Sequence, residues 1–300
     1  MKLYPKFLLK KTGYIKLKKM NKYVIGTANF GRNYGLFKKK VNKNEVSKIL
    51  RLAKKLKIQL VDTANFYGNA EKILGKSKYK NFKYITKIKV SKNHIKKPIY
   101  LKKLILNSIK NLKIKQIYAV LIHNPFFLKI DRKKNVLKIL EELKKEGYIK
   151  KIGASIYEKN EIKFLLKNFK LDIVQLPHSI FDRRFSSSGI MRKLKNKDIE
   201  VHIRSIFLQG SLLKKNKSTS FSKWKKLYRT FGEWVISKKI SNLQACVKFV
   251  ISQKNIDKIV IGVDSAKQLS EINKIKKTKN LTFPNFVPEN EKKLINPKYW

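Results

Sequence analysis

Short apolar runs alternate with amphipathic segments along most of the chain. Runs such as "YAVLIH" and "IVIGV" are almost continuously apolar, as expected for strands of a parallel sheet that is covered on both faces. Eight runs of this kind predict eight strands. The predicted strands cover residues 23–27, 59–62, 84–88, 118–123, 151–155, 173–176, 201–205 and 258–263.

The segments between these strands carry apolar residues at helical spacing. The predicted helices cover residues 44–56, 100–112, 136–146, 158–166, 243–252 and 265–275, and a further helical pattern begins at Ala70. Eight strand-then-helix units in roughly 250 residues match the count and length of a (β/α)8 TIM barrel. A doubly wound open sheet is the alternative, but six strands suffice for that fold and two would be left over.

The two ends of the chain depart from this repeating pattern. We expect one domain over residues 1–300, with the barrel in residues 22–276. Residues 1–21 are a basic extension in which "KFLLKKTGYIKL" has two strand-like runs around Lys-Lys-Thr-Gly, the pattern of a hairpin that closes the barrel bottom. Met20 is an alternative start. Residues 277–300 contain three prolines and no clear periodicity, which predicts a tail lying over the barrel.

The chain is strongly basic, with 73 Lys and Arg against 19 Asp and Glu and a formal charge of +54. Such a charge raises the question of a nucleic-acid partner. The lysines are spread along the whole chain, and neither zinc-finger spacing nor an aromatic-basic ribonucleoprotein pattern is present. We therefore interpret the lysines as solvated helix faces, and we expect no specific nucleic-acid partner. Anionic substrates and cofactor phosphates would still be attracted to this charge.

Membrane and secretory classes are not supported by the sequence. No apolar run is long enough to cross a bilayer. In the N-terminal segment the longest apolar stretch is Phe-Leu-Leu, which is too short for a signal peptide. Cys246 is the only cysteine, which excludes an internal disulfide framework and fits a reducing compartment. We expect a cytoplasmic protein without a membrane partner.

Polar residues stand where the predicted strands end, which is where the active sites of TIM barrels lie. They are Thr27, Asp62, Lys87, His123, Ser155, Gln175, Arg204 and Ser205, with Tyr67 in the loop after Asp62 and "IGVDSAKQL" at the eighth strand. Each of them alone has an ordinary structural explanation, such as a helix cap or a turn. Their joint occurrence, in order and at strand ends, indicates a site.

Four of these side chains suit the delivery of a proton to a carbonyl oxygen while a hydride attacks the carbon. A free tyrosine has a pKa of about 10, which is too high for an efficient acid at neutral pH. A nearby ammonium lowers such a pKa. We expect Asp62 to anchor Lys87, Lys87 to lower the pKa of Tyr67, and Tyr67 to be the proton donor. His123 would orient the carbonyl.

These residues and the motifs around them resemble the aldo-keto reductase family. The stretches "IGTANFG", "VDTANFYGNAEKILG", "ITK", "LIHNP", "GYIKKIGAS", "IVQLP" and "FLQGSL" occur in the order of that family, over most of the chain. The family's catalytic Asp, Tyr, Lys and His correspond to Asp62, Tyr67, Lys87 and His123. The resemblance implies a (β/α)8 enzyme that uses NAD(P)H, without a metal, to reduce an aldehyde or ketone. It also implies a monomer.

The resemblance assigns further residues to the cofactor. Ser155 and Gln175 would bind the nicotinamide carboxamide, and residues 205–210 would cover the pyrophosphate. The implied cofactor-binding residues are Thr27, Ser155, Gln175, Arg204, Ser205, Phe207, Leu208, Gly210, Gly262, Ser265 and Gln268, the last three along the adenosine end. A phosphate is well placed at a helix N-terminus, where unpaired N–H groups point at it.

Three departures from the family's pattern bear on these assignments. Ser155 is followed by Ile156 where many members have Asn, and Arg204 stands where many stack a tyrosine on the nicotinamide. The Lys-Ser-x-x-Arg pattern that some members use for the 2′-phosphate of NADP is replaced by "VDSAKQ". There Asp264 would repel the phosphate and Lys267 would attract it. NADP(H) is expected on family frequency, and NAD(H) stays open.

The substrate is expected to be a small carbonyl compound, with a weak preference for a sugar-derived one. An alternative function is a regulatory protein of the same fold that binds NADP(H) without turnover. The complete set Asp62, Tyr67, Lys87 and His123 speaks against that alternative, because a pure binding module does not need it.

Overall fold

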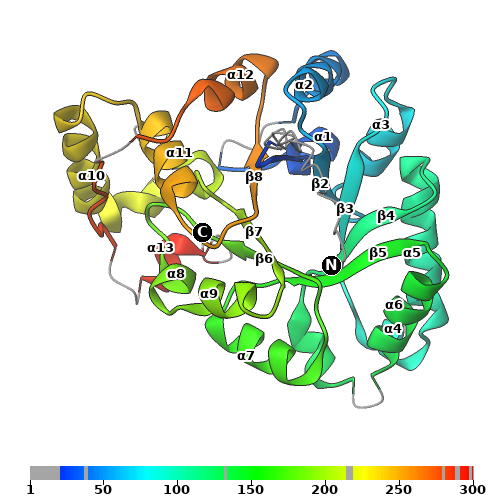
Figure 1. The fold of residues 1–300 in the computed structure, drawn as a ribbon. Coiled ribbons are helices and arrows are strands. Elements are labelled where there is room, and N and C mark those ends of the chain that lie inside the picture. Colours follow the sequence, from blue (N-terminus) through cyan, green and yellow to red (C-terminus); the bar gives the residue numbers. More distant parts are fainter. Residues whose placement is uncertain are drawn as a thin grey trace, which may run out of the picture.

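Eight parallel strands close into one barrel with helices around it (Figure 1). The computed structural model describes residues 21–36, 40–131, 134–213, 219–278, 281–287, 291–296 and 299. The expected (β/α)8 barrel is confirmed, and the alternative open sheet is excluded because β1 pairs with β8. The strands are β1 Tyr23–Gly26, β2 Leu60–Ala64, β3 Lys83–Ile88, β4 Ile117–Ile122, β5 Ile149–Ser155, β6 Ile173–Pro177, β7 Glu200–Arg204 and β8 Lys258–Gly262.

The helices surround the strands in the order of the sequence (Figure 1). The α-helices are α1 Ala28–Gly31, α2 Lys43–Lys55, α3 Ala70–Lys76, α4 Lys92–Lys96, α5 Ile99–Leu112, α6 Asn135–Lys145, α7 Lys159–Asn168, α8 Arg184–Ser187, α9 Ile190–Lys195, α10 Lys225–Ser237, α11 Asn242–Ser252, α12 Ala266–Lys274 and α13 Lys292–Ile295. Three 3-10 helices are η1 Pro125–Lys129, η2 Leu208–Gly210 and η3 Thr219–Trp224. None of the described helices combines the length and the apolar character that crossing a bilayer requires.

The strands hold two apolar cores, as their continuous apolar runs require. One core fills the inside of the barrel; it consists of Val24, Leu60, Ile85, Ala119, Leu121, Ile173 and Val260. The other lies between the outer face of the barrel and the helices. Helix α2 contributes Val46, Ile49, Leu50 and Ala53 to it, an i, i+3, i+4, i+7 set that faces one side of a helix.

The alternation of side chains along each strand places polar residues at one mouth of the barrel. Successive side chains of a strand point to opposite faces. Because Leu60, Ile85 and Ile173 point inward, so do the residues two positions later, Asp62 and Lys87 among them. The pairing of Ala64 with Lys87 brings β2 and β3 into register at this end. The expected strand-end residues therefore meet at the carboxyl ends of the strands.

The chain ends and α10 are additions to the repeating strand–helix units of the barrel. The predicted hairpin falls in residues 1–20, outside the described residues. Helix α10 was not predicted, although its buried residues Phe231 and Val235 stand four positions apart, as residues on one face of a helix do. The described part of the tail packs there: the ring of Phe286 lies 5.4 Å from that of Phe231 and 5.5 Å from that of Trp234.

Candidate active site

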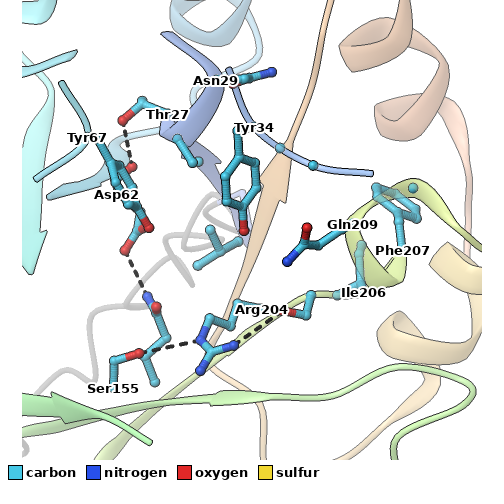
Figure 2. A pocket seen from close by; sticks show the side chains of 18 of the residues that line it. Thr27, Asn29, Tyr34, Asp62, Tyr67, Ser155, Arg204, Ile206, Phe207 and Gln209 are labelled. Atoms are coloured by element: carbon cyan, nitrogen blue, oxygen red, sulfur yellow. Dashed lines mark hydrogen bonds between the residues drawn. The ribbon is translucent and has the colours of Figure 1, made fainter. Parts of the chain in front are cut away.

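A cavity of about 320 Å³ opens at the carboxyl ends of the strands, lined by residues from most of the βα loops. Figure 2 shows Tyr34, Asp62 and Arg204 around it. Besides Tyr67 and Lys87, eleven of the expected residues line it: Thr27, Asp62, His123, Ser155, Gln175, Arg204, Ser205, Phe207, Gly210, Gly262 and Gln268. No residue of the described tail does. Within the described ranges, no group of three or more His, Cys, Asp or Glu is placed to hold a metal ion.

Asp62 and Lys87 form a buried ion pair at the base of the cavity. The Lys87 ammonium donates to Oδ2 of Asp62 and, over 3.0 Å, to the carbonyl oxygen of Thr63. Both side chains are almost fully buried. Gln175 Nε2 donates to the other carboxylate oxygen, Oδ1, over 2.8 Å. Both oxygens of Asp62 therefore have a donor, as a buried carboxylate requires.

Gln175 has a second feature that bears on ligand binding. While its Nε2 donates to Asp62, its Oε1 is buried and has no hydrogen-bond partner among the described residues. A buried acceptor left without a donor costs free energy. An amide donor of a bound ligand would remove that cost.

Tyr67 is held at the cavity by a close approach of two backbones. Its N–H donates to the carbonyl of Ala64 over 3.0 Å. A Cβ atom on Gly31, at the end of α1, would lie only 1.8 Å from the carbonyl oxygen of Tyr67, so no larger residue fits there. Gly68 follows with a φ of +58°, a conformation that favours glycine. Lys87 Nζ lies 5.2 Å from the centre of the Tyr67 ring.

The pKa of Tyr67 moves opposite to expectation. Burial raises the pKa of this phenol above its ordinary value, and the negative charge of Asp62 adds to the increase. Arg204 and Arg32 lower the pKa without outweighing burial. The expectation of a lowered pKa is therefore wrong. The physical reason is first that the phenol is buried, and second that it feels the negative charge of Asp62, with which Lys87 is paired.

His123 follows β4 directly and lies among aromatic rings. Its backbone N–H donates to the carbonyl of Ile88 over 2.8 Å, which continues the pairing of β3 and β4. The imidazole is edge-on to Phe66, with ring centres 4.9 Å apart, and edge-on to Tyr157 at 6.4 Å. His123 and Tyr67 thus share one cavity, with Phe66 between them; the rings of Phe66 and Tyr67 lie 5.2 Å apart.

Arg204 lies over an aromatic ring inside the cavity. Its Cζ is 3.9 Å from the centre of the Tyr157 ring, a cation–π contact. Its guanidinium donates to Ser155 Oγ over 3.4 Å (Figure 2). It also donates to Ser205 Oγ over 3.2 Å and to the carbonyl of Ile156 over 3.0 Å. Ser155, which was expected to face a carboxamide, here accepts from Arg204.

The loop after β7 contains several residues in the left-handed backbone region, which residues other than glycine rarely adopt. Ser205, Leu208 and Gln209 have φ values of 62°, 43° and 53°, and Gly210 has 95°. Left-handed non-glycine residues cost of order 1–3 kcal/mol each and cluster at functional sites. Gln209 accepts a backbone hydrogen bond of 3.2 Å from Leu36, so the loops after β1 and β7 meet beside the cavity. The Leu208 side chain is buried and is not part of the cavity lining.

Backbone N–H groups at the N-terminus of α12 donate to side-chain oxygens of the protein itself. Ser265 Oγ accepts from Gln268 N over 3.2 Å, and Gln268 Oε1 accepts from Asp264 N over 2.8 Å. The Glu45 carboxylate, from α2, accepts from Ala266 N over 2.7 Å. Ser265 is therefore a helix cap and does not line the cavity, whereas Gln268 does.

Several cavity residues were not found from the sequence. They are Ala28, Asn29, Tyr34, Gly35, Tyr157 and Leu213, together with Gly26 and Val260. Most lie in loops without periodicity, so that no pattern marks them. Tyr157 is the exception: it stands two residues after β5 and belongs to the same strand-end set as Ser155.

The barrel is similar to those of known proteins. The model described as "Aldo/keto reductase family" matches residues 22–283. Among solved structures, the aldo-keto reductase AKR11C1 from Bacillus halodurans (holo form) is similar, with 18% identity, coverage of 87% of this chain and 88% of that chain, and a TM-score of 0.70. The glycerol dehydrogenase AKR11B4 from Gluconobacter oxydans has 20% identity, coverage of 88% of both chains and a TM-score of 0.68. The search of curated proteins gave no match.

Proposed function

The chain belongs to the aldo/keto reductase family, and from this premise we propose that it uses NAD(P)H to reduce an aldehyde or ketone to an alcohol. One observation carries the proposal: Tyr67, His123 and the buried pair Asp62–Lys87 line a single cavity at the carboxyl mouth of the barrel. This is where (β/α)8 enzymes hold their catalytic groups.

Each group has a part in a balanced reaction. The coenzyme, when bound, supplies a hydride to the carbonyl carbon. Tyr67 gives its phenolic proton to the carbonyl oxygen, which yields the alcohol, and the phenolate regains a proton from water. The raised pKa keeps Tyr67 in the protonated form that this step needs, while the charges of Arg204 and Arg32 favour the phenolate that follows. His123 orients the carbonyl oxygen.

The residues at the cavity suit a nicotinamide coenzyme. The unpartnered, buried Oε1 of Gln175 is an acceptor for the carboxamide N–H. Thr27 after β1 and Ser155 at the end of β5 line the cavity from opposite sides of the barrel. Residues 205–210 would supply the loop for the pyrophosphate. Arg204 would face the nicotinamide ring, as the resemblance to the family implies. We assign the binding of the coenzyme to these residues as part of the proposal.

The choice between NADPH and NADH depends on the carboxylates beside α12. Glu45 accepts from the first turn of that helix, and Asp264 is held by Asn29 Nδ2 over 2.8 Å. Both charges would repel a 2′-phosphate placed at the helix N-terminus. We expect Glu45→Gln to tighten NADPH binding relative to NADH by about fivefold, equal to about 1 kcal/mol. Fluorescence titration of both coenzymes measures it, and Glu271→Gln, farther along α12, is the matched control.

Two measurements test the function itself. A thermal-shift series with NADPH, NADH and their oxidised forms shows whether a coenzyme binds; a ligand at about 100 times its Kd adds roughly 2.7 kcal/mol of stability. Mixing the NADPH-loaded protein with glyceraldehyde and other small aldehydes then shows whether NADPH is oxidised. Binding without oxidation of NADPH by any aldehyde would favour the regulatory protein instead.

The proposal includes a monomer in the cytoplasm. Cys246, the single cysteine, is buried and unpaired. Burial raises the pKa of its thiol, which keeps it protonated and weakly reactive. Size-exclusion chromatography with light scattering would test the monomer directly.

A further inference from the structure

Arg32 is an exposed cation beside the proposed proton donor. Its Cζ lies 5.0 Å from the centre of the Tyr67 ring and 5.7 Å from that of Tyr34. Tyr34 and Tyr67 both line the cavity, so Arg32 stands at its edge. No carboxylate among the described residues pairs with the Arg32 guanidinium. Its five N–H donors are thus directed to solvent and to the two rings.

Two more cations surround the same place. Lys89 Nζ lies 4.6 Å from the centre of the Phe66 ring, and Phe66 contacts both Tyr67 and His123. In the described part of the chain, Lys89 also has no carboxylate partner. Arg204 lies on another side, against Tyr157. The loops after β1 and β3 and the end of β7 thus each bring one cation to the surroundings of Tyr67 and His123.

The acidic side chains near the cavity do not balance these cations. Asp62 is already compensated by Lys87 and by the amide of Gln175. Asp264 is held by Asn29 beside α12. The region around Tyr67 therefore has an excess of positive charge that nothing in the described protein neutralises.

We propose that the substrate carries an anionic group, a carboxylate or a phosphate, which binds Arg32 while its carbonyl lies at Tyr67. This inference rests on the proposed function and names the substrate class of the same site. A guanidinium suits this role because its planar N–H groups bind the oxygens of a carboxylate or phosphate in pairs. The aromatic rings on which Arg32 lies hold it at the mouth while leaving these donors available.

The test compares carbonyl compounds that differ only in the charged group. One pair is para-formylbenzoate and its methyl ester; the other is glyceraldehyde 3-phosphate and glyceraldehyde. The measured quantity is the ratio of kcat/KM for the anionic and the neutral member, because a general effect on Tyr67 or on folding cancels in a ratio. The variants are Arg32→Met, Arg32→Lys and, as a matched loss of one positive charge, Arg192→Met. Arg192 is exposed on α9, which lies across the barrel from α1 (Figure 1).

We expect the wild-type protein to prefer the anionic member of at least one pair. Arg32→Met should lower that ratio by about tenfold, equal to about 1.4 kcal/mol, and Arg32→Lys should lower it less. The Arg192→Met ratio should match that of the wild type, which separates a local contact from attraction by the overall charge of +54. The pair with the larger drop tells a carboxylate from a phosphate.

Other results would overturn the inference or the function separately. If the neutral compounds are reduced but Arg32→Met keeps the wild-type ratios, the inference is wrong and the proposed function stands. If no compound is reduced, the proposed function fails, and calorimetric titration with para-formylbenzoate and glyceraldehyde 3-phosphate decides the inference. Equal affinities of the wild type and Arg32→Met for both anions would then refute it.

Discussion

Tyr67→Phe is expected to remove nearly all carbonyl reduction while leaving coenzyme binding unchanged. The substitution deletes only the phenolic O–H. A positioned general acid contributes typically about 10²–10⁴-fold to the rate, and a loss in that range is expected in kcat. The ring itself stays, so that its contacts with Phe66 and with the Arg32 guanidinium are kept. NADPH oxidation under saturating aldehyde measures the rate, and fluorescence titration measures the coenzyme Kd.

The cavity offers a matched control for this variant, because Tyr34 is a second phenol in the same space (Figure 2). Tyr34 is the more exposed of the two side chains, at 38% against 9% for Tyr67. Tyr34→Phe is expected to keep most of the turnover, because Tyr34 is not beside the Asp62–Lys87 pair in the loop after β2. A large loss of turnover in Tyr34→Phe together with normal turnover in Tyr67→Phe would show that Tyr34, and not Tyr67, is the proton donor.

The barrel and the place of its site follow from local patterns. Strands that are apolar on both faces predict a covered parallel sheet, and a polar residue at an inward position must lie where the barrel opens. Asp62 and Gln175 illustrate this: each stands two positions after an inward apolar residue, Leu60 and Ile173. Their presence at one mouth was therefore predictable from the sequence.

Contacts between segments far apart in the sequence were not predictable, since only closure of the barrel brings these segments together. The hydrogen bond from Gln175 to Asp62 joins β6 to β2, and that from Ala266 to Glu45 joins α12 to α2. No pattern within either segment records its partner. The direction in which the pKa of Tyr67 shifts was not predictable either. Its direction depends on how deeply the phenol is buried and on how fully Asp62 compensates Lys87, and both are properties of the assembled site.

Lys87→Met is expected to have the largest effect on stability, and it should also abolish turnover. Lys87 and Asp62 are almost fully buried, so that the substitution leaves a carboxylate in the barrel with only the Gln175 amide as a side-chain donor. Breaking a buried ion pair by removing one partner costs about 3–5 kcal/mol. Urea denaturation measures the free energy of unfolding, and the slope of that transition should not change. A matched surface variant is Lys102→Met, which breaks exposed pairs with Glu142 and Glu146 and should change stability little.

A double variant separates the cost of the unpaired charge from the role of the ammonium. Asp62→Asn removes the orphaned charge and keeps an acceptor for Gln175, so Asp62→Asn/Lys87→Met should regain much of the lost stability. The double variant should not regain turnover, because the Lys87 ammonium near Tyr67 is still missing. Recovery of both would show that Lys87 acts on the reaction only by keeping the barrel folded. An unfolding midpoint of Lys87→Met equal to that of the wild type would show that the charges are not paired in the folded protein. The pair then could not be what holds the Lys87 ammonium near the Tyr67 phenol.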